Sequence, residues 1–358
     1  MPIPVQRSLP DVLNALQAWL PARFPVATDV VVDPNLAVPS DVGNANETIC
    51  FTVTRHEAGV AVAEELVLRI APTTYQMFLD VDFTRQRQLI QAVGHHSAVP
   101  VPGVRWFEDD PTVLGAPFFI MDRIAGRAPG DRPSYNCPGT WVAKLTRSEQ
   151  QRLWENAMAT FCRVHTEVSA EAMAPYATRP GSSGDGLGDE LDYWARFADW
   201  AGATSPTMAR ALARLRADRP DAQPFSLSWG DARLENMLFD DRLDCVAVLD
   251  WEMAGMAGPM VDLGWWLFVD RFACAVSGVP RLAGLADREH TCRRWRELTG
   301  IATDDVAWYE LFAAYRMTAL VVQTVSLHAS VGIDLGATFS VADNPALRIL
   351  DNMLIATG

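Results

Sequence analysis

Strand-like and helix-like segments are segregated along this chain of 358 residues. Up to about residue 122, short β-branched or apolar runs such as 48–54 and 64–71 alternate with helical patterns. Beyond Gly126 the hydrophobic spacing is mainly helical, and one strongly β-patterned segment, 225–251, interrupts it. Such segregation is typical of α+β proteins. We therefore expect a small β-rich lobe over 1–122 and a larger, mainly helical lobe over 123–358.

The charge balance excludes several classes of partner. Thirty basic and 44 acidic residues give a net charge of −14, which opposes binding to a nucleic-acid backbone or an anionic membrane surface. No apolar stretch reaches the roughly 18 residues of a membrane span, and the six cysteines show no C-x-x-C spacing. We expect a soluble, cytoplasmic protein with no nucleic-acid or membrane partner. Its oligomeric state is left open.

The β-patterned segment contains three residues that could carry chemistry. Asp231 and Asn236 stand five residues apart, and Asp250 ends the apolar run 246–249. An Asp and an Asn at this spacing alone are usually a turn and cap pair. A carboxylate at the end of a buried strand, however, is costly unless it is paired or binds a metal. Phosphoryl transfer needs such a set, with one carboxylate to orient the attacking hydroxyl, and an amide and a second carboxylate to hold Mg²⁺.

The wider motif identifies a family resemblance. The runs WGDARLENMLF (229–239), VLDWE (248–252) and DLGW (262–265) resemble the H-G-D-x-x-x-x-N, [IL]-D-W-E and D-L-A signatures of the aminoglycoside phosphotransferase and choline kinase family. Among its members, this variant most resembles the kinase-like domains related to those fused to acyl-CoA dehydrogenases. The resemblance implies a bilobal protein-kinase-like fold, with an antiparallel β lobe and the nucleotide between the lobes.

The resemblance also implies roles for individual residues. Asp231 would be the catalytic carboxylate, and Asn236 and Asp250 would bind Mg²⁺. Arg233 stands where protein kinases carry a lysine that touches the γ-phosphate. The phosphate donor would be ATP or GTP, and the acceptor a hydroxyl of a small molecule bound by the helical lobe.

The nucleotide-binding residues depart from the family pattern. The sequence GNANET resembles the family's phosphate-covering G-x-S-N-x-T turn, and Arg69 stands in place of the lysine that binds the α- and β-phosphates. Arginine keeps the charge but presents a longer, forked donor set. The partner of that lysine, a glutamate, aligns with Gln86, and the hinge falls near Met121. The expected nucleotide-binding residues are Gly43, Asn44, Asn46, Thr48, Arg69 and Met121.

Several further residues are expected to support the site. Trp229 replaces the motif histidine, which removes a backbone-bracing imidazole but no catalytic atom. We expect Asp262 to brace the catalytic loop or cap its helix, and His165 to be a core histidine beneath that loop. Tryptophans in the helical patterns are expected to pack the lobe and line its acceptor pocket: Trp194, Trp200, Trp265, Trp266 and Trp308.

The sequence thus favours a magnesium-dependent small-molecule kinase. Its acceptor stays open among a hydroxyacyl-CoA, an amino alcohol and a sugar. A polycationic aminoglycoside is disfavoured because the helical lobe has no dense acidic run. The alternative hypothesis is a catalytically weak pseudokinase that senses nucleotide or acts as a scaffold, and it rests on Arg69 and Gln86.

Overall fold

The computed structural model describes residues 7–39, 46–80, 82–221, 224–336 and 338–356. Contacts divide the chain into two compact units. The first comprises Met1–Gln91 and Pro102–Ile124, and the second comprises Ala92–Val101 and Ala125–Gly358. The lobe boundary expected between residues 122 and 123 stays a prediction.

The first unit is built on an antiparallel sheet of five strands in the order β1-β2-β3-β5-β4. The strands are β1 (Ala27–Val32), β2 (Glu47–Glu57), β3 (Val60–Ile70), β4 (Val104–Glu108) and β5 (Phe118–Asp122). The helical elements are α1 (Leu9–Trp19), the 3₁₀ turn η1 (Leu20–Arg23) and α2 (Phe83–His96), which continues into the second unit. Strand β1 was not expected; three of its six residues, ATDVVV, are exposed, and burial does not alternate along it.

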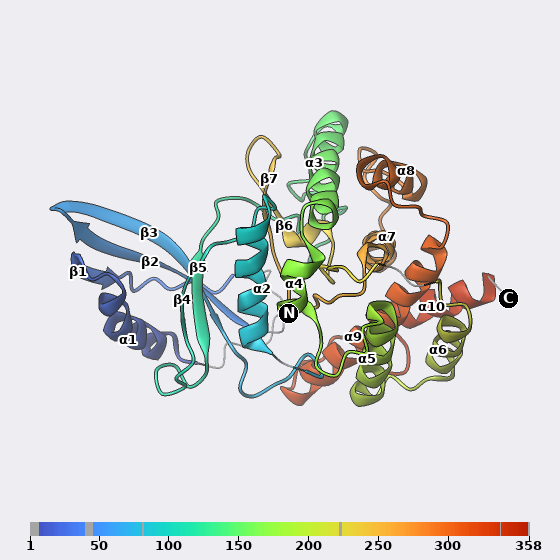
Figure 1. Cartoon of the computed structure of the whole chain (residues 1–358), viewed down its shortest axis with the longest axis horizontal. Helices are drawn as coiled ribbons and strands as arrows, with labels where there is room; N and C mark the ends of the chain where they lie inside the picture. Colours follow the sequence, from blue (N-terminus) through green and yellow to red (C-terminus); the bar gives the residue numbers. More distant parts are fainter. Residues whose placement is uncertain (1–6, 40–45, 81, 222–223, 337, 357–358) are drawn as a thin grey trace. The chain divides into compact units, whose positions relative to one another are not determined.

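The core of this unit lies between the sheet and α1 (Figure 1). Val12 and Leu16 of α1 are buried together with Leu66 and Leu68 of β3, and Ser8 caps the helix by accepting a hydrogen bond from Asp11 N. Side chains alternate between the two faces of a strand. Arg69, between the core residues Leu68 and Ile70, therefore points to the face away from this core.

The second unit is mainly helical. Its helices are α3 (Arg147–Thr166), α4 (Ala170–Ala177), α5 (Gly186–Ala201), α6 (Pro206–Ala217), α7 (Pro259–Ser277), α8 (Arg288–Thr299), α9 (Val306–Ser330) and α10 (Pro345–Ala356). A short 3₁₀ turn, η2 (Leu234–Asn236), leads into a two-stranded antiparallel ribbon of β6 (Met237–Phe239) and β7 (Cys245–Val248). With the sheet of the first unit, this confirms the expected α+β class, with a small antiparallel sheet and a larger helical part.

The β-patterned segment forms less strand than expected. Residues 225–229 form no strand, and a single bridge joins Ser228 to Gly255. The chain turns immediately afterwards, at Gly230, and cannot continue as a strand. None of the helices in the described ranges is both long and apolar enough to cross a membrane.

Candidate active site

A glycine with a positive φ angle creates the turn that presents Asp231. Gly230 has φ +93°, and a Cβ atom there would lie 2.2 Å from the carbonyl oxygen of Met253. Any other residue would therefore clash with backbone as well as strain the turn. The backbone of Ser228 is held on Gly255 by hydrogen bonds of 2.8 and 3.0 Å. Asp231 follows at the start of the loop that leads into η2.

Three side chains hold the Asp231 carboxylate. Trp265 Nε1 donates to Oδ1 at 2.7 Å, while Asn236 Nδ2 and Arg233 Nε donate to Oδ2 at 2.7 and 3.2 Å. Asn236 Nδ2 also donates to the main-chain oxygen of Asp231 at 3.0 Å. The carboxylate is partly buried and fixed in orientation from both oxygens. The structure therefore brings together three residues that the sequence singled out, Asp231, Arg233 and Asn236.

The same arrangement suits a magnesium ion. The nitrogen of the Asn236 amide is directed to Asp231, so the amide oxygen is the atom that would face a cation. Leu249 N donates to the main-chain oxygen of Asn236 at 2.9 Å, which ties the segment of Asp250 to η2. Asp250 has φ +55°, a conformation that Asp tolerates better than most residues. One carboxylate and one amide oxygen fit Mg²⁺, which usually takes its remaining ligands from phosphates and water.

Arg233 is the cation of this loop. Burial tends to lower its pKa, but the nearby carboxylates of Asp231, Asp131, Glu235 and Asp250 raise the pKa above its usual value. Its Nη1 lies 3.7 Å from Asp131 Oδ2. Burial raises the pKa of Glu235 to about 8, although Arg233 opposes the shift. At neutral pH the loop thus holds a permanent positive charge on Arg233.

Asp262 braces the loop from α7, as expected. Its Oδ2 accepts a hydrogen bond from Trp229 N at 2.6 Å and its Oδ1 accepts one from Gly230 N at 2.7 Å. Burial raises the pKa of Asp262 to about 7 even though both bonds favour the ionised form. His165 is buried beneath it, with Nε2 3.4 Å from Asp262 Oδ2, and burial lowers the pKa of this imidazole to about 3. His165 is therefore a neutral core residue, which confirms its expected place.

Trp229 corrects one expectation. Its indole Nε1 donates to the main-chain oxygens of Leu249 at 2.8 Å and Asp250 at 3.2 Å. The residue that replaces the motif histidine thus supplies a brace of its own, which holds the segment of Asp250 to the catalytic loop.

Trp265 has a different role from the expected pocket wall, since its indole binds Asp231. The sequence contained the signal, because Trp265 follows Asp262 by three residues and residues at this spacing share a helix face. Trp194 does not line the cavity either, and Arg316 packs on its ring. Trp200 is 41% exposed. Only Trp266 and Trp308 of the five expected tryptophans line the cavity described below.

The remaining expected residues lie in the first unit. Thr48 pairs with Arg69 across β2 and β3, and Met121 of β5 pairs with Val67, so these four side chains share the sheet face away from the core. The Thr48 hydroxyl is buried and has no hydrogen-bond partner within the described ranges.

Helix α2 binds the residue that precedes β2. Asn46 Nδ2 donates to Gln86 Oε1 at 3.1 Å, and both side chains are buried. The carbonyl of Gln86 is therefore engaged by Asn46. Gly43 and Asn44 lie outside the described residues.

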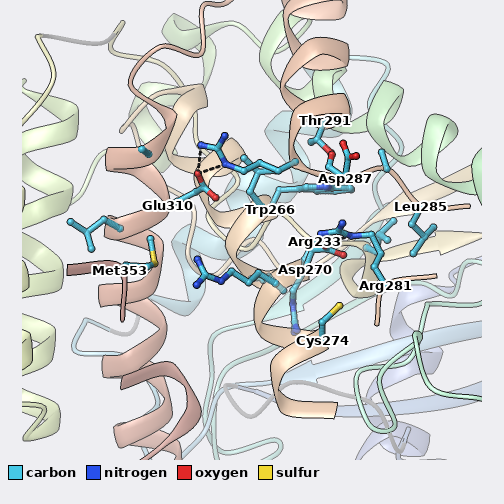
Figure 2. Close-up of a pocket in the computed structure, with 18 of the residues that line it drawn as sticks. Arg233, Trp266, Asp270, Cys274, Arg281, Leu285, Asp287, Thr291, Glu310 and Met353 are labelled. Atoms are coloured by element: carbon cyan, nitrogen blue, oxygen red, sulfur yellow. Dashed lines mark hydrogen bonds and ion pairs between the residues drawn. The ribbon is translucent and has the colours of Figure 1, made fainter. Parts of the chain in front are cut away.

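A cavity of about 600 Å³ adjoins the catalytic loop within the second unit (Figure 2). Arg233, Leu234 and Glu235 form part of its wall. Much of the rest is apolar and comes from α3, α7, α9 and α10: Trp154, Trp266, Leu267, Trp308, Leu311 and Met353. The cavity therefore has a largely apolar wall that ends at the catalytic loop, beside Asp231.

Charged side chains of this wall are largely matched in pairs. Arg281 Nε donates to Asp270 Oδ2 at 2.7 Å, and Tyr135 donates to Oδ1 of the same carboxylate at 3.1 Å. The Arg288 guanidinium binds Glu310 Oε2 at 2.8 and 2.6 Å. This pairing leaves the wall without a dense negative charge.

Comparison with known sequences gives a consistent assignment. The profile of the phosphotransferase enzyme family matches residues 43–301. Mouse acyl-CoA dehydrogenase family member 10 is 28% identical over 233 residues, which cover 63% of this chain and 20% of that protein. The chain thus spans about a fifth of the length of this curated relative.

Solved structures share the fold. A putative aminoglycoside phosphotransferase of Ralstonia eutropha aligns with a TM-score of 0.67 at 22% identity and covers 95% of both chains. A thermostable mutant of the aminoglycoside phosphotransferase APH(4)-Ia, in a ternary complex with AMP-PNP and hygromycin B, aligns with a TM-score of 0.52 at 15% identity, over 96% of this chain and 99% of that one.

Proposed function

Because this chain belongs to the phosphotransferase enzyme family, we propose that it is a magnesium-dependent kinase that transfers the γ-phosphoryl group of ATP or GTP to a hydroxyl of a small molecule. The observation that carries the proposal is the Asp231 carboxylate, held at both oxygens by Trp265, Asn236 and Arg233. A fixed carboxylate beside an amide oxygen and a second carboxylate is the set that phosphoryl transfer requires.

In the proposed step the acceptor oxygen attacks the γ-phosphorus while the bond to the β–γ bridging oxygen breaks. Asp231 orients the acceptor hydroxyl and takes its proton. Arg233, which stays charged, stabilises negative charge on the transferred group. Asn236 and Asp250 would hold Mg²⁺, which would neutralise charge on the nucleotide phosphates.

The first unit would contribute the remaining nucleotide contacts. Arg69 would bind the phosphates in place of the family lysine, since a guanidinium offers two parallel donors to phosphate oxygens. The buried Thr48 hydroxyl shares its sheet face and has a donor to offer. Gly43, Asn44, Asn46 and Met121 complete the proposed nucleotide-binding set.

The acceptor would occupy the cavity beside Arg233 and Glu235. Its apolar wall favours an acceptor with an apolar portion, such as a hydroxyacyl-CoA, over a sugar or a small amino alcohol. The paired carboxylates of Asp270 and Glu310 disfavour a polycationic aminoglycoside, because each is already neutralised by an arginine.

One observation favours the alternative, a pseudokinase that binds nucleotide without turnover. Gln86, at the position of the family glutamate, binds Asn46 through its carbonyl and carries no charge to pair with Arg69. Such a protein would bind nucleotide without Mg²⁺ or not at all, and would show no turnover.

The test measures magnesium-dependent nucleotide binding and slow hydrolysis of ATP and GTP. Asp231→Asn should lower hydrolysis by about 100-fold or more with binding retained, as expected for loss of a general base. Asp250→Asn should remove the Mg²⁺ dependence of binding. The matched control is Asp241→Asn, an exposed carboxylate beyond β6 that should leave both unchanged. If neither site variant alters hydrolysis or binding, the proposal is wrong.

A further inference from the structure

Arg316 is a fully buried guanidinium on α9 and lies beyond the residues that the family profile matches. Its Nη2 donates to the main-chain oxygen of Gly230 at 2.9 Å, directly before Asp231. Its guanidinium carbon lies 4.5 Å from the centre of the Trp265 ring and 4.8 Å from that of Trp194. A charge so deeply buried needs compensation, so its partners indicate what it does.

Two of these contacts lead to the same carboxylate. Through Gly230, Arg316 holds the backbone from which Asp231 projects. Through Trp265, it packs on the indole whose Nε1 donates to Asp231 Oδ1 at 2.7 Å. A cation over an aromatic face is an attractive contact, and it also restricts the tilt of the ring. The direction of the Trp265 N–H bond, and with it the Asp231 carboxylate, thus depends on Arg316.

A close approach of two helices sets this contact. Gly264 of α7 faces Tyr309 of α9, where a Cβ atom would lie 2.5 Å from the Tyr309 Cβ. Trp265 directly follows Gly264, and Arg316 follows Tyr309 by seven residues, about two helical turns along the same face. The absent side chain at Gly264 therefore lets α9 bring Arg316 onto Trp265.

The electrostatic surroundings favour a cation at this point. Glu190 and Asp262 are buried, and their charges act on Arg316 against the burial that lowers its pKa. Glu190 already binds Arg179 at 3.0 and 3.2 Å, whereas Asp262 is engaged by the Trp229 and Gly230 amides. Arg316 therefore holds Gly230 by its carbonyl while Asp262 holds the same residue by its amide.

A purely structural arginine in a core would be expected to use most of its donors. Arg316 has two buried nitrogens, Nε and Nη1, with no hydrogen-bond partner in the described part of the chain. The side chain makes one hydrogen bond, to the Gly230 carbonyl, and packs on the Trp265 ring, while these two nitrogens stay without a partner. This cost is understandable if the position of the loop is what matters.

We propose that Arg316 is a positioning residue for the transfer step, which fixes the Gly230 backbone and the Trp265 indole and thereby orients the Asp231 carboxylate toward the acceptor hydroxyl. This inference rests on the proposed kinase function. It assigns Arg316 no contact with substrate.

The kinetic test compares Arg316→Lys, Arg316→Met and Trp265→Phe in magnesium-dependent hydrolysis of ATP. Arg316→Met and Trp265→Phe should each lower kcat by roughly 10- to 100-fold with a KM for ATP within about twofold of wild type, because they disturb orientation and not binding. Arg316→Lys should recover part of the loss. The double variant should be little worse than the worse single one, since both act on Asp231.

The control is Arg55→Met, which removes another buried arginine that stacks on an aromatic ring, Phe24, at 4.3 Å. Arg55 lies on β2 in the first unit, whereas Gly230 and Trp265 belong to the second, and its loss should change kcat by less than about twofold. A loss of kcat in this control equal to that in Arg316→Met would indicate a general structural effect and overturn the inference.

A second measurement does not depend on turnover. In protein labelled with 5-fluorotryptophan, the ¹⁹F resonance of Trp265 is assigned by its loss in Trp265→Phe. Asp231→Asn and Arg316→Met should both shift that resonance, and Arg55→Met should not. If wild type hydrolyses ATP but Arg316→Met leaves kcat and the resonance unchanged, the inference alone fails. If wild type shows no magnesium-dependent hydrolysis, the proposed function fails and this inference with it.

Discussion

Arg69 gives the sharpest prediction at the scale of single residues. It shares a sheet face with Thr48, away from the core formed by Leu66 and Leu68. If its guanidinium binds the nucleotide phosphates, Arg69→Ala should weaken Mg–ATP binding by about tenfold, the order of one charge-assisted hydrogen-bond pair. Arg69→Lys keeps the charge and should lose less than about threefold.

Isothermal titration calorimetry checks this prediction. Arg105→Ala is the control in the same unit, because Arg105 is an exposed arginine whose nearest acidic partners are Glu64 and Asp122. Equal affinity in wild type, Arg69→Ala and Arg69→Lys would mean that phosphate binding relies on other groups.

His165 predicts a particular response to acid. Burial lowers the pKa of its imidazole to about 3, against about 6.5 in an unfolded chain, so the unfolded state binds more protons throughout that window. The contribution of His165 to stability is therefore complete above pH 6.5 and falls as the pH drops toward 3. At pH 5 the loss should be about 2 kcal/mol.

The comparison of wild type with His165→Phe isolates this effect. The free energy of unfolding should fall between pH 7 and pH 5 by about 2 kcal/mol more in wild type than in the variant. Asp262, whose raised pKa acts in the opposite direction, is present in both proteins. Urea unfolding followed by tryptophan fluorescence reports mainly on the second unit, since Trp19 and Trp106 alone among the twelve tryptophans lie in the first. The same pH dependence in both proteins would contradict a neutral, buried His165.

Helices α7 and α9 carry the prediction that belongs to the scale of elements. Helix propensity alone predicts that Gly264→Ala stabilises α7 by about 1 kcal/mol. The contact with Tyr309 predicts the opposite, because the new Cβ would lie 2.5 Å from the Tyr309 Cβ and backbone oxygen is nearly as close. We expect a net destabilisation of about 1–3 kcal/mol, as for overpacked cores.

Thermal and urea unfolding measure the outcome for Gly264→Ala, and hydrolysis assays should show a parallel loss of kcat if α9 carries Arg316 away from Trp265. A variant as stable as wild type or more so would show that the two helices can separate without cost.

Elements were predictable where local pattern determines them. The β-branched or apolar runs 48–54 and 64–71 correspond to β2 and β3, and the mainly helical spacing beyond Gly126 corresponds to the helices of the second unit. The pattern misled at 225–229, because the turn at Gly230 depends on the distant Met253 carbonyl. Asp231 and Asn236 could be predicted because their spacing along the chain is a local pattern. The contacts of Trp265 and Arg316 with the loop could not, because they depend on tertiary packing.

At the scale of the whole molecule, chain order and compact units do not coincide. Residues 92–101 belong to the second unit although first-unit residues flank them on both sides. Long-range hydrogen bonds explain this, since Val248 N donates to Pro100 O at 2.8 Å and Arg163 donates to Ala98 O. A local sequence pattern does not indicate such distant partners. Two lobes could therefore be predicted, but not that residues 92–101 belong to the second unit.

The proposed magnesium ligands Asn236 and Asp250 both belong to the second unit. Mg–AMP-PNP should therefore stabilise this unit, by about 2.7 kcal/mol at a concentration 100 times its Kd. Hydrogen exchange read by mass spectrometry should show slower exchange in peptides covering 231–250. Asp250→Asn should abolish this protection and Asp241→Asn should not. Unchanged exchange over 231–250 at saturating Mg–AMP-PNP would contradict the proposed ligands, because a ligand slows opening where its binding energy is lost on opening.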